Sequence, residues 1–197
     1  DVTVVEHADV TRPVIETVAL DFTDGVMTIS ATETLDASFT DNVGDYEDIQ
    51  RLLEEEHPLQ MMLLDDTLSL LGATVSEEDS KVLYITLTEY RRTKAMELSN
   101  MTGIALQVGS ASVEDMAGNT NLAVGSYTIA ETPDEQIPIV ESAAVDYSTG
   151  VVTITSNEFI DMSPLSLIDT TLMYISETAG GDDVHLTGAT VTEKTVV

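Results

Sequence analysis

The sequence contains no cysteine and no tryptophan, and each absence narrows the functions open to it. Without cysteine, the chain cannot form disulfide bridges, thiolate metal sites or a cysteine nucleophile. Aromatic residues make up only 5% of the chain, so aliphatic side chains and methionine must fill any core. No apolar run approaches the length of about 18 residues that a membrane-spanning helix needs. We therefore expect globular domains and no direct membrane insertion.

Basic residues are also scarce, because 7 lysines and arginines stand against 36 aspartates and glutamates. The resulting net charge of -29 repels phosphate groups, so nucleic acid and anionic membranes are not expected as partners. Self-repulsion of this size favours a saline medium or bound divalent cations that screen the charges. An acidic surface that serves solubility alone is the alternative interpretation.

What the sequence does contain is an internal repeat. The stretch Pro13–Asp36 returns without a gap about 125 positions later, at Pro138–Asp161. A unit of this length is too long for a solenoid repeat and is large enough to bury a core of its own. The identical pairs include Pro13/Pro138, Glu16/Glu141, Asp21/Asp146, Gly25/Gly150, Thr28/Thr153, Ile29/Ile154, Glu33/Glu158 and Asp36/Asp161.

The repeat extends to both ends of the chain. Asp1–Asp9 matches Ser126–Asp134 at the same offset, and Leu186–Val191 repeats Leu70–Val75. The sequence therefore predicts a window cut from a longer array of domains. We expect the last strand of a preceding repeat at residues 1–10, a complete domain at 11–133 and an incomplete second domain at 134–197.

Alternating apolar and polar residues predict a hairpin from Val14–Asp21 and Val26–Thr32, with a positive φ at Gly25 in the turn. A helix is expected over Glu89–Leu98, capped by Thr88 and ended by Asn100–Gly103. A second short helix is expected in an insertion at residues 41–57. Further strands are predicted within the ranges Leu59–Leu64, Leu68–Val75, Lys81–Thr88, Ile104–Val113 and Val124–Ala130.

About seven short strands with one or two short helices favour an all-β fold. Among all-β architectures, turns at this spacing favour a two-layer antiparallel sandwich over a barrel or a parallel sheet.

Four features follow one another along the chain: a strand entered by proline (Pro13, Pro138), the pair Glu33 and Asp36, the Asp115–Asn119 loop, and an acidic linker. In these features the chain resembles bacterial immunoglobulin-like repeats of the S-layer and adhesin type. The resemblance implies tandem immunoglobulin-like antiparallel β-sandwich domains in an extracellular, cell-surface array. It also implies stiffening by calcium between domains.

Calcium takes six to eight oxygen ligands, which carboxylates on neighbouring loops and linkers can supply. No EF-hand pattern is present, so any site would be assembled from separate segments. The alternative is ordinary turn chemistry, in which Asp and Asn bond their own backbone. The candidate metal ligands are Glu33, Asp36, Asp115, Asn119, Glu131 and Asp134, with Glu158 and Asp161 in the second copy.

Asn100 begins the Asn-x-Thr glycosylation acceptor of the chain and is expected in a loop between a helix and a strand. The histidines His7, His57 and His185 stand in unrelated contexts, so a zinc or catalytic role is not expected for them. The sequence contains no Gly-x-Ser-x-Gly elbow, His-Glu-x-x-His helix or phosphate-binding glycine loop. We therefore expect no enzymatic activity.

These observations predict a structural repeat of an extracellular or cell-surface fibre, such as an S-layer, an appendage filament or an adhesin stalk. Its partners would be copies of itself or neighbouring repeats. The alternative is an adhesion module in which the 41–57 insertion or the loops bind a glycan or a surface protein. An accessory domain of a polysaccharide hydrolase ranks third.

Overall fold

The computed structural model divides the chain into two compact units, Asp1–Ile137 (unit 1) and Pro138–Val197 (unit 2). The helix expected at residues 41–57 and the candidate ligand Asp161 lie outside the described residues. The structure describes residues 5–37, 60–62, 67–70, 72–76, 78–122, 124–160, 168–178 and 183–192.

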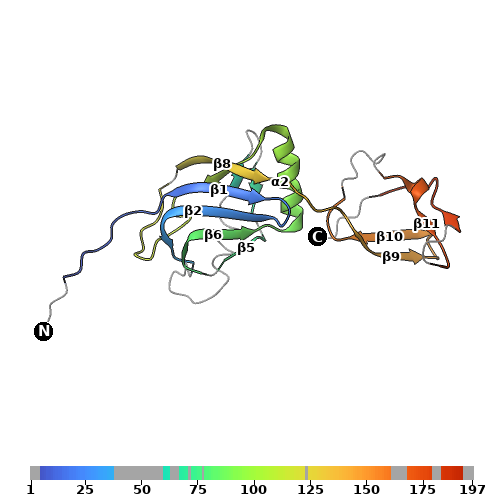
Figure 1. Cartoon of the computed structure of the whole chain (residues 1–197), viewed down its shortest axis with the longest axis horizontal. Helices are drawn as coiled ribbons and strands as arrows, with labels where there is room; N and C mark the ends of the chain where they lie inside the picture. The colour runs from blue at the N-terminus through green and yellow to red at the C-terminus, as the bar shows by residue number, and fades with distance from the viewer. Residues whose placement is uncertain are drawn as a thin grey trace. The chain divides into compact units, whose positions relative to one another are not determined.

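Unit 1 is mostly β, with one helix among its described residues (Figure 1). Its strands form one curled sheet in the order β4-β3-β7-β8-β1-β2-β6-β5. The elements are β1 (Ile15–Asp21), β2 (Val26–Leu35), β3 (Gln60–Met62), β4 (Thr67–Ser69), β5 (Thr74–Val75), β6 (Ser80–Thr86), α2 (Glu89–Thr102), β7 (Ala105–Val108) and β8 (Val124–Thr132).

The sheet is mixed, because β1 and β8 pair in parallel while the other neighbouring strands pair antiparallel. The prediction of a purely antiparallel fold is therefore wrong at this pair. The first and last strands of the unit lie side by side and run in the same direction, with Val18 opposite Ile129 and Asp21 opposite Thr132. Pairing between strands so far apart in sequence leaves no local pattern for a sequence to reveal.

The core lies on one face of this sheet and follows the alternation expected of strands. From β1 and β2 it takes Leu20, Met27 and Ile29, each with no exposed surface. Leu106 from β7 and Ile85 from β6 are likewise fully buried. Burying each such side chain stabilises the fold by about 1.5–3 kcal/mol relative to leaving it in water.

The predicted first hairpin is confirmed. Asp21 Oδ1 accepts a hydrogen bond of 2.8 Å from the Thr23 amide, and the Gly25 amide donates to the Asp21 carbonyl at 2.9 Å. Gly25 has φ of 71°, a left-handed conformation that a Cβ disfavours. The turn therefore depends on the glycine that both copies of the repeat contain.

The helix begins as predicted but runs further. Thr88 caps it by accepting a hydrogen bond from the Arg91 amide, and it ends where the Gly103 amide donates to the Ser99 carbonyl. The prediction that Asn100 lies in a loop is wrong, because the last turn of α2 reaches Thr102 before a glycine ends it. Among the described residues, no helix combines the length and apolar character that crossing a membrane requires.

Unit 2 contains a hairpin with the same pairing as that of unit 1. Asp21 pairs with Val26 in one copy, and Asp146 pairs with Val151 in the other. Both hairpins have a register shift at the same repeat position, and Gly150 has φ of 72°. The elements of unit 2 are β9 (Val140–Asp146), β10 (Val151–Ser156), the 3-10 helix η2 (Thr170–Leu172), β11 (Tyr174–Ile175) and β12 (Val184–His185).

The likeness continues in the hydrogen bonds beside the hairpins. The Val14 amide donates to Thr32 Oγ1 at 3.1 Å, and at the equivalent positions the Ile139 amide donates to Asn157 Oδ1 at 2.6 Å. In the later matching stretch, Gly72 and Gly188 have φ values of 81° and 84°. Each stands inside a turn of the same kind, closed by a 2.9 Å backbone hydrogen bond. The sequence repeat is therefore a repeat of local structure.

Candidate functional site

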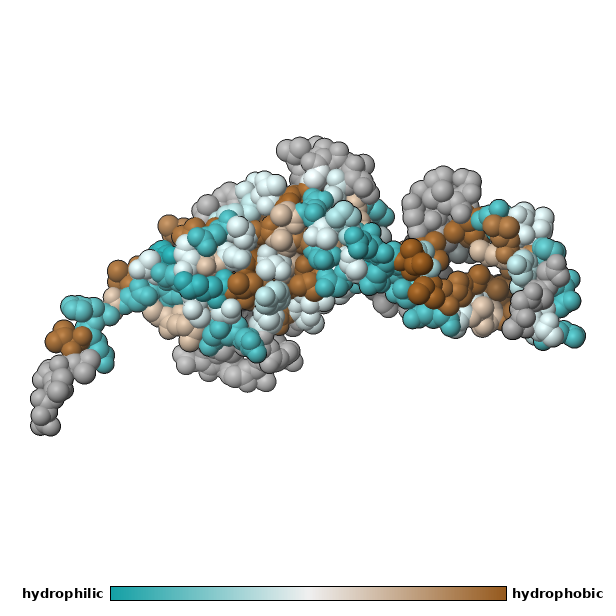
Figure 2. All heavy atoms as spheres, in the orientation of Figure 1, coloured by the Kyte–Doolittle hydropathy of each residue, from teal (hydrophilic) through white to brown (hydrophobic). Residues whose placement is uncertain are grey.

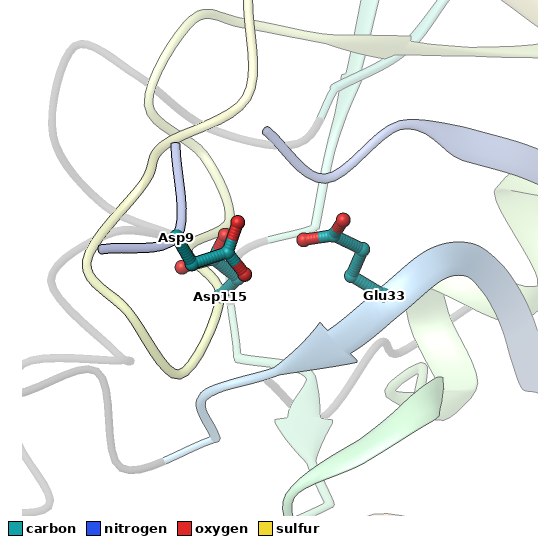
Figure 3. A group of neighbouring side chains, drawn as sticks. All are labelled: Asp9, Glu33 and Asp115. Atoms are coloured by element: carbon teal, nitrogen blue, oxygen red, sulfur yellow. The ribbon is translucent and has the colours of Figure 1, made fainter. Parts of the chain in front are cut away.

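Three carboxylates gather where the chain enters β1. Asp9 comes from the extended segment before β1, Glu33 from the last part of β2, and Asp115 from the loop between β7 and β8. Their ligand oxygens all lie within 4.8 Å of one another. Figure 3 shows the carboxylates of Asp9 and Asp115 next to each other, with that of Glu33 reaching toward them. We call these three residues the acidic cluster.

The loop holds Asp115 firmly in the cluster. The residue is only 3% exposed, and Oδ1 accepts hydrogen bonds from the Ala117 and Asn119 amides at 2.8 and 2.9 Å. Asn119 Nδ2 donates to Oδ2 at 3.0 Å. Burial by itself would raise the pKa of Asp115, but hydrogen bonds from Asn119 and Ala117 outweigh it and lower that pKa. Asp115 therefore stays charged more readily than Glu33, whose pKa is shifted the other way.

Glu33 has the opposite tendency. Desolvation raises its pKa, and the charge of Asp9 and a hydrogen bond with Asp115 raise it further, while Lys81 opposes the change. Three carboxylates this close repel one another unless a proton or a cation compensates them. Carboxylate oxygens are the ligands that calcium prefers, although three residues supply only part of its usual coordination shell. Either a proton on Glu33 or a bound cation would relieve the repulsion.

The segment that precedes β1 is also tied to the loop by hydrogen bonds to backbone carbonyls. Asn119 Nδ2 donates to the Asp9 carbonyl at 3.3 Å, and Arg12 Nη1 donates to the Thr120 carbonyl at 2.7 Å. The Thr11 amide closes a small turn on Asp9 Oδ1 at 2.9 Å. The acidic cluster therefore forms part of a wider contact between the entering chain and the 115–120 loop.

The structure brings together part of the predicted ligand set. Glu33, Asp115 and Asn119 meet at the acidic cluster. Asp36 lies beside the same loop, where its amide donates to the Glu114 carbonyl at 2.9 Å, but its carboxylate is not one of the three. In unit 2, the Glu158 carbonyl accepts a hydrogen bond from the Ser156 hydroxyl.

Glu131 and Asp134 lie at the other end of the β1–β2 hairpin, beside its turn. Glu131 accepts hydrogen bonds from the Ser99 hydroxyl and, at 3.1 Å, from the Ile104 amide. Asp134 pairs with Arg92 at 3.1 Å, and Arg92 also contacts the backbone of the hairpin turn. These two carboxylates therefore position α2 and the chain that leaves β8, and they do not join the acidic cluster.

Arg92 is the centre of this second arrangement. Its side chain is 6% exposed, and its Nε and Nη2 atoms donate to Glu89 at 2.8 and 2.9 Å. Nη1 donates to the Phe22 carbonyl at 2.7 Å, to the Thr23 carbonyl at 3.2 Å and to Asp134. One guanidinium thus joins helix α2, the turn of the β1–β2 hairpin and the segment of chain that follows β8.

Sequence reasoning missed both Arg92 and Asp9. Arg92 follows Glu89 by three residues on a predicted helix, a spacing that brings side chains together, but nothing distinguished it from Arg91. Asp9 occupies the repeat position of Asp134, which was a candidate ligand, so the alignment itself contained the signal. Equivalent linker acids therefore lie at the entry and at the exit of unit 1.

Comparison with protein-family models, with curated proteins and with solved structures found no match to this chain.

Proposed function

We propose that this chain is a force-bearing structural repeat of an extracellular or cell-surface fibre. The observation that carries the proposal is the hairpin that recurs in both units with the same register, register shift and glycine turn. A chain built from copies of one strand-rich unit, with a short connection between copies, has the construction of an array. The third fragment, at residues 1–9, fits the same array.

The strand order supports an immunoglobulin-like fold for each complete unit. Immunoglobulin sandwiches place strands A, B, E and D in one sheet and strands C, F and G in the other. In unit 1 the order β1-β2-β6-β5 corresponds to A-B-E-D, and β3-β7-β8 corresponds to C-F-G with β4 beside C. The parallel pair β1–β8 joins the two groups. Helix α2 is then an insertion between strands E and F.

This arrangement suits a unit that is pulled from both ends. The chain enters at the start of β1 and leaves at the end of β8, and these two strands run parallel and in contact. Tension on the two ends therefore slides β1 and β8 past each other along their length. Because the hydrogen bonds run between the strands, they share the load, whereas bonds at an end that peels open break one after another.

Contacts at both ends of unit 1 fasten the segments that enter β1 and leave β8. Tension on the chain should therefore load the β1–β8 pair before it loads the other strands. The entry segment is fastened by Arg12 and Asn119, and the exit segment by the pairing of Asp134 with Arg92. In a calcium-containing medium, a cation in the acidic cluster would replace repulsion by attraction and stiffen the entry. The high negative charge of the chain gives such screening a large effect.

Single-molecule stretching of the chain between two handles tests this role. Ala130→Pro removes a backbone donor from β8, and Thr74→Pro makes the same change in edge strand β5. Both native side chains are exposed, so neither change alters the core. We expect a clear unfolding-force peak that falls much more for Ala130→Pro than for Thr74→Pro. Equal reductions, or stretching without a force peak, would contradict the role.

Location and the alternative function need separate tests. Protease treatment of intact source cells is expected to release fragments of the chain, and complete protection would refute a surface location. Binding of a glycan or a surface protein by residues 41–57 stays a prediction, because these residues lie outside the described part of the chain.

A further inference from the structure

The two hairpins of the repeat differ more on their buried side than on the side that faces outward. Side chains alternate along a strand, so the residues of β1 and β2 that do not enter the core of unit 1 share its outer face. Five of the seven outward pairs are identical in the two copies, and the other two keep a hydroxyl group. The outward pairs are Glu16/Glu141, Thr17/Ser142, Ala19/Ala144, Asp21/Asp146, Val26/Val151, Thr28/Thr153 and Ser30/Thr155.

The buried side has changed much more. Of the six core positions in the paired part of the hairpin, only Ile29 returns unchanged, as Ile154. Cores accept the exchange of one apolar residue for another, so this divergence is ordinary. Exposed positions are usually free to change, because substitutions there have little effect on stability. Retention of the outer face therefore indicates a contact outside the hairpin. The core pairs are Ile15/Val140, Val18/Ala143, Leu20/Val145, Met27/Val152, Ile29/Ile154 and Ala31/Ser156.

Local structure explains only part of this retention. Asp21 accepts a hydrogen bond of 2.8 Å from the Thr23 amide, and Asp146 does the same in the second copy, so the turn accounts for both acids. A strand favours valine and threonine, but isoleucine or tyrosine would serve it as well. Alanine is depleted in strands, yet Ala19 stands in the middle of β1 and returns as Ala144. A small side chain at this position lets another surface come close.

In unit 1 the outer face extends to the strands on either side of the hairpin. Ala19 lies between Ala130 on β8 and Thr28 on β2, and Thr28 lies beside Tyr84 on β6. Figure 2 shows pale, weakly polar residues together with brown, apolar ones over the strands that Figure 1 labels β1, β2 and β6. We give the name neutral face to the uncharged outward residues Thr17, Ala19, Val26, Thr28, Ser30, Val82, Tyr84 and Ala130. Its retained positions in unit 2 are Ser142, Ala144, Val151, Thr153 and Thr155.

We propose that the neutral face of one copy packs against the neutral face of a second copy of this chain, so that copies associate side by side. Each copy has a net charge of -29, which favours contact where carboxylates are few. The small side chains let two sheets approach to the roughly 10 Å at which packed sheets lie. The proposal goes beyond the mechanical role, because a single fibre can bear force without a neighbour.

A second copy is the occupant that the repeat itself favours. A two-fold contact uses the same patch on both partners, so a residue retained for that contact is retained in every copy. A glycan fits less well, because the positions that both units retain include no aromatic side chain that could stack on a sugar ring. A basic partner would be drawn to the carboxylates elsewhere on the chain and not to an uncharged face.

The size of the face sets the expected strength of the contact. The four strands β8-β1-β2-β6, about 4.8 Å apart and each with about three outward residues, cover about 400 Å². A stable interface buries about 800 Å² of each partner, so one such face supports only weak association. Glu16 and Asp21 lie beside the neutral face, near the two ends of β1, so salt that screens their charges is expected to strengthen the contact.

Sedimentation velocity of residues 1–197 at high salt tests the proposal with two matched variants. The face variant combines Thr28→Glu with Thr153→Glu, because each unit carries the retained positions. The control variant combines Gln107→Glu with Gln136→Glu, at exposed positions outside the neutral face, and adds the same charge. We expect the average mass of the native chain and of the control variant to rise with concentration, whereas the face variant stays monomeric.

A native chain that stays monomeric up to about 1 mM would overturn the proposal. Equal association of the two variants would assign the contact to another surface and overturn it too. The circular dichroism spectra of the dilute variants are expected to match that of the native chain, which excludes a folding defect. Stretching follows single molecules, so this proposal and the force-bearing role can fail separately.

Thiol protection tests the same contact without adding charge, because the native chain has no cysteine. Thr17→Cys places a thiol on the neutral face, and Gln107→Cys places one outside it, at positions that are both exposed. As the chain concentration rises, we expect reaction with a maleimide reagent to slow at the first thiol and to keep its rate at the second. Equal rates for the two thiols at every concentration would refute the contact.

Discussion

Replacing Arg92 by methionine is expected to destabilise unit 1 far more than the same replacement of its neighbour Arg91. The Arg92 guanidinium donates to the carbonyls of Phe22 and Thr23, and a hydrogen bond from a charged donor contributes about 1.5–3 kcal/mol. The Thr23 contact is the longer of the two, so we assign the lower value to each and about 3 kcal/mol to both. The pairs with Glu89 and Asp134 add at most about 1 kcal/mol because both carboxylates are partly exposed.

Arg91 is the matched control because it stands in the same helical turn and lies 5.5 Å from the centre of the Tyr90 ring. Losing that contact costs about 0.5–1 kcal/mol. Urea unfolding followed by the helix signal in circular dichroism measures both variants. With a slope of about 2 kcal/mol per molar urea, Arg92→Met should lower the midpoint by about 1.5–2 M and Arg91→Met by no more than about 0.5 M. Equal midpoints for the two variants would refute the central position given to Arg92.

Gly25→Ala and Gly150→Ala both place a Cβ at a positive φ, which costs about 1–2 kcal/mol. Only Gly25 has a close neighbour, since its added Cβ would meet Arg92 Cδ at 3.2 Å, so hydrogen exchange should rise more in the first hairpin than in the second. Calcium at a hundredfold excess over its dissociation constant should stabilise unit 1 by about 2.7 kcal/mol against chelator, as measured by thermal unfolding. Glu33→Gln should reduce that gain, and an unchanged midpoint in the native chain would remove calcium from the proposal. Without calcium, Glu33→Gln should stabilise unit 1 near neutral pH. The native pKa of Glu33 is raised, so the stability that the protonated form contributes is lost as pH rises through that value. Hydrogen bonds from Ser148 and Thr149 lower the pKa of Asp146 to about 2, so its stabilising contribution is present above about pH 4 and should be lost as pH falls toward 2. A titration of Asp146 followed by NMR that gave an ordinary pKa would contradict the turn geometry.

The parts of the fold that the sequence predicts are those with a local physical cause. The first hairpin follows from alternation and from one glycine, and the start of α2 follows from the side chain of Thr88. The glycine at position 103, and not Asn100, ends the helix, because an asparagine can continue a helical turn and a glycine at positive φ closes it. Local chemistry therefore predicted where these elements form, to within a turn of helix.

What the sequence did not predict depends on contacts between distant segments. The parallel pairing of β1 with β8 joins strands from opposite ends of unit 1, and no residue type specifies a parallel partner. Arg92 is distinguished from Arg91 only by what surrounds it after folding. The predicted metal ligands lie at opposite ends of the β1–β2 hairpin. The sequence gives the order of the loops and linkers along the chain, but the strands that they follow decide which end of the sheet each of them reaches.

The repeat also shows how one residue position acquires two roles. Asp9 and Asp134 occupy the same place in successive copies, just before a proline-entered hairpin. In unit 1, the entering acid lies among two other carboxylates, whereas the departing acid is paired with a buried arginine. The negative charge of Asp134 is therefore balanced by Arg92, whereas the repulsion among the three carboxylates around Asp9 is relieved only by a proton or a cation from the medium. Within unit 1, the repulsion at the entry therefore responds to pH and to cations, whereas the exit acid already has a cationic partner in the protein.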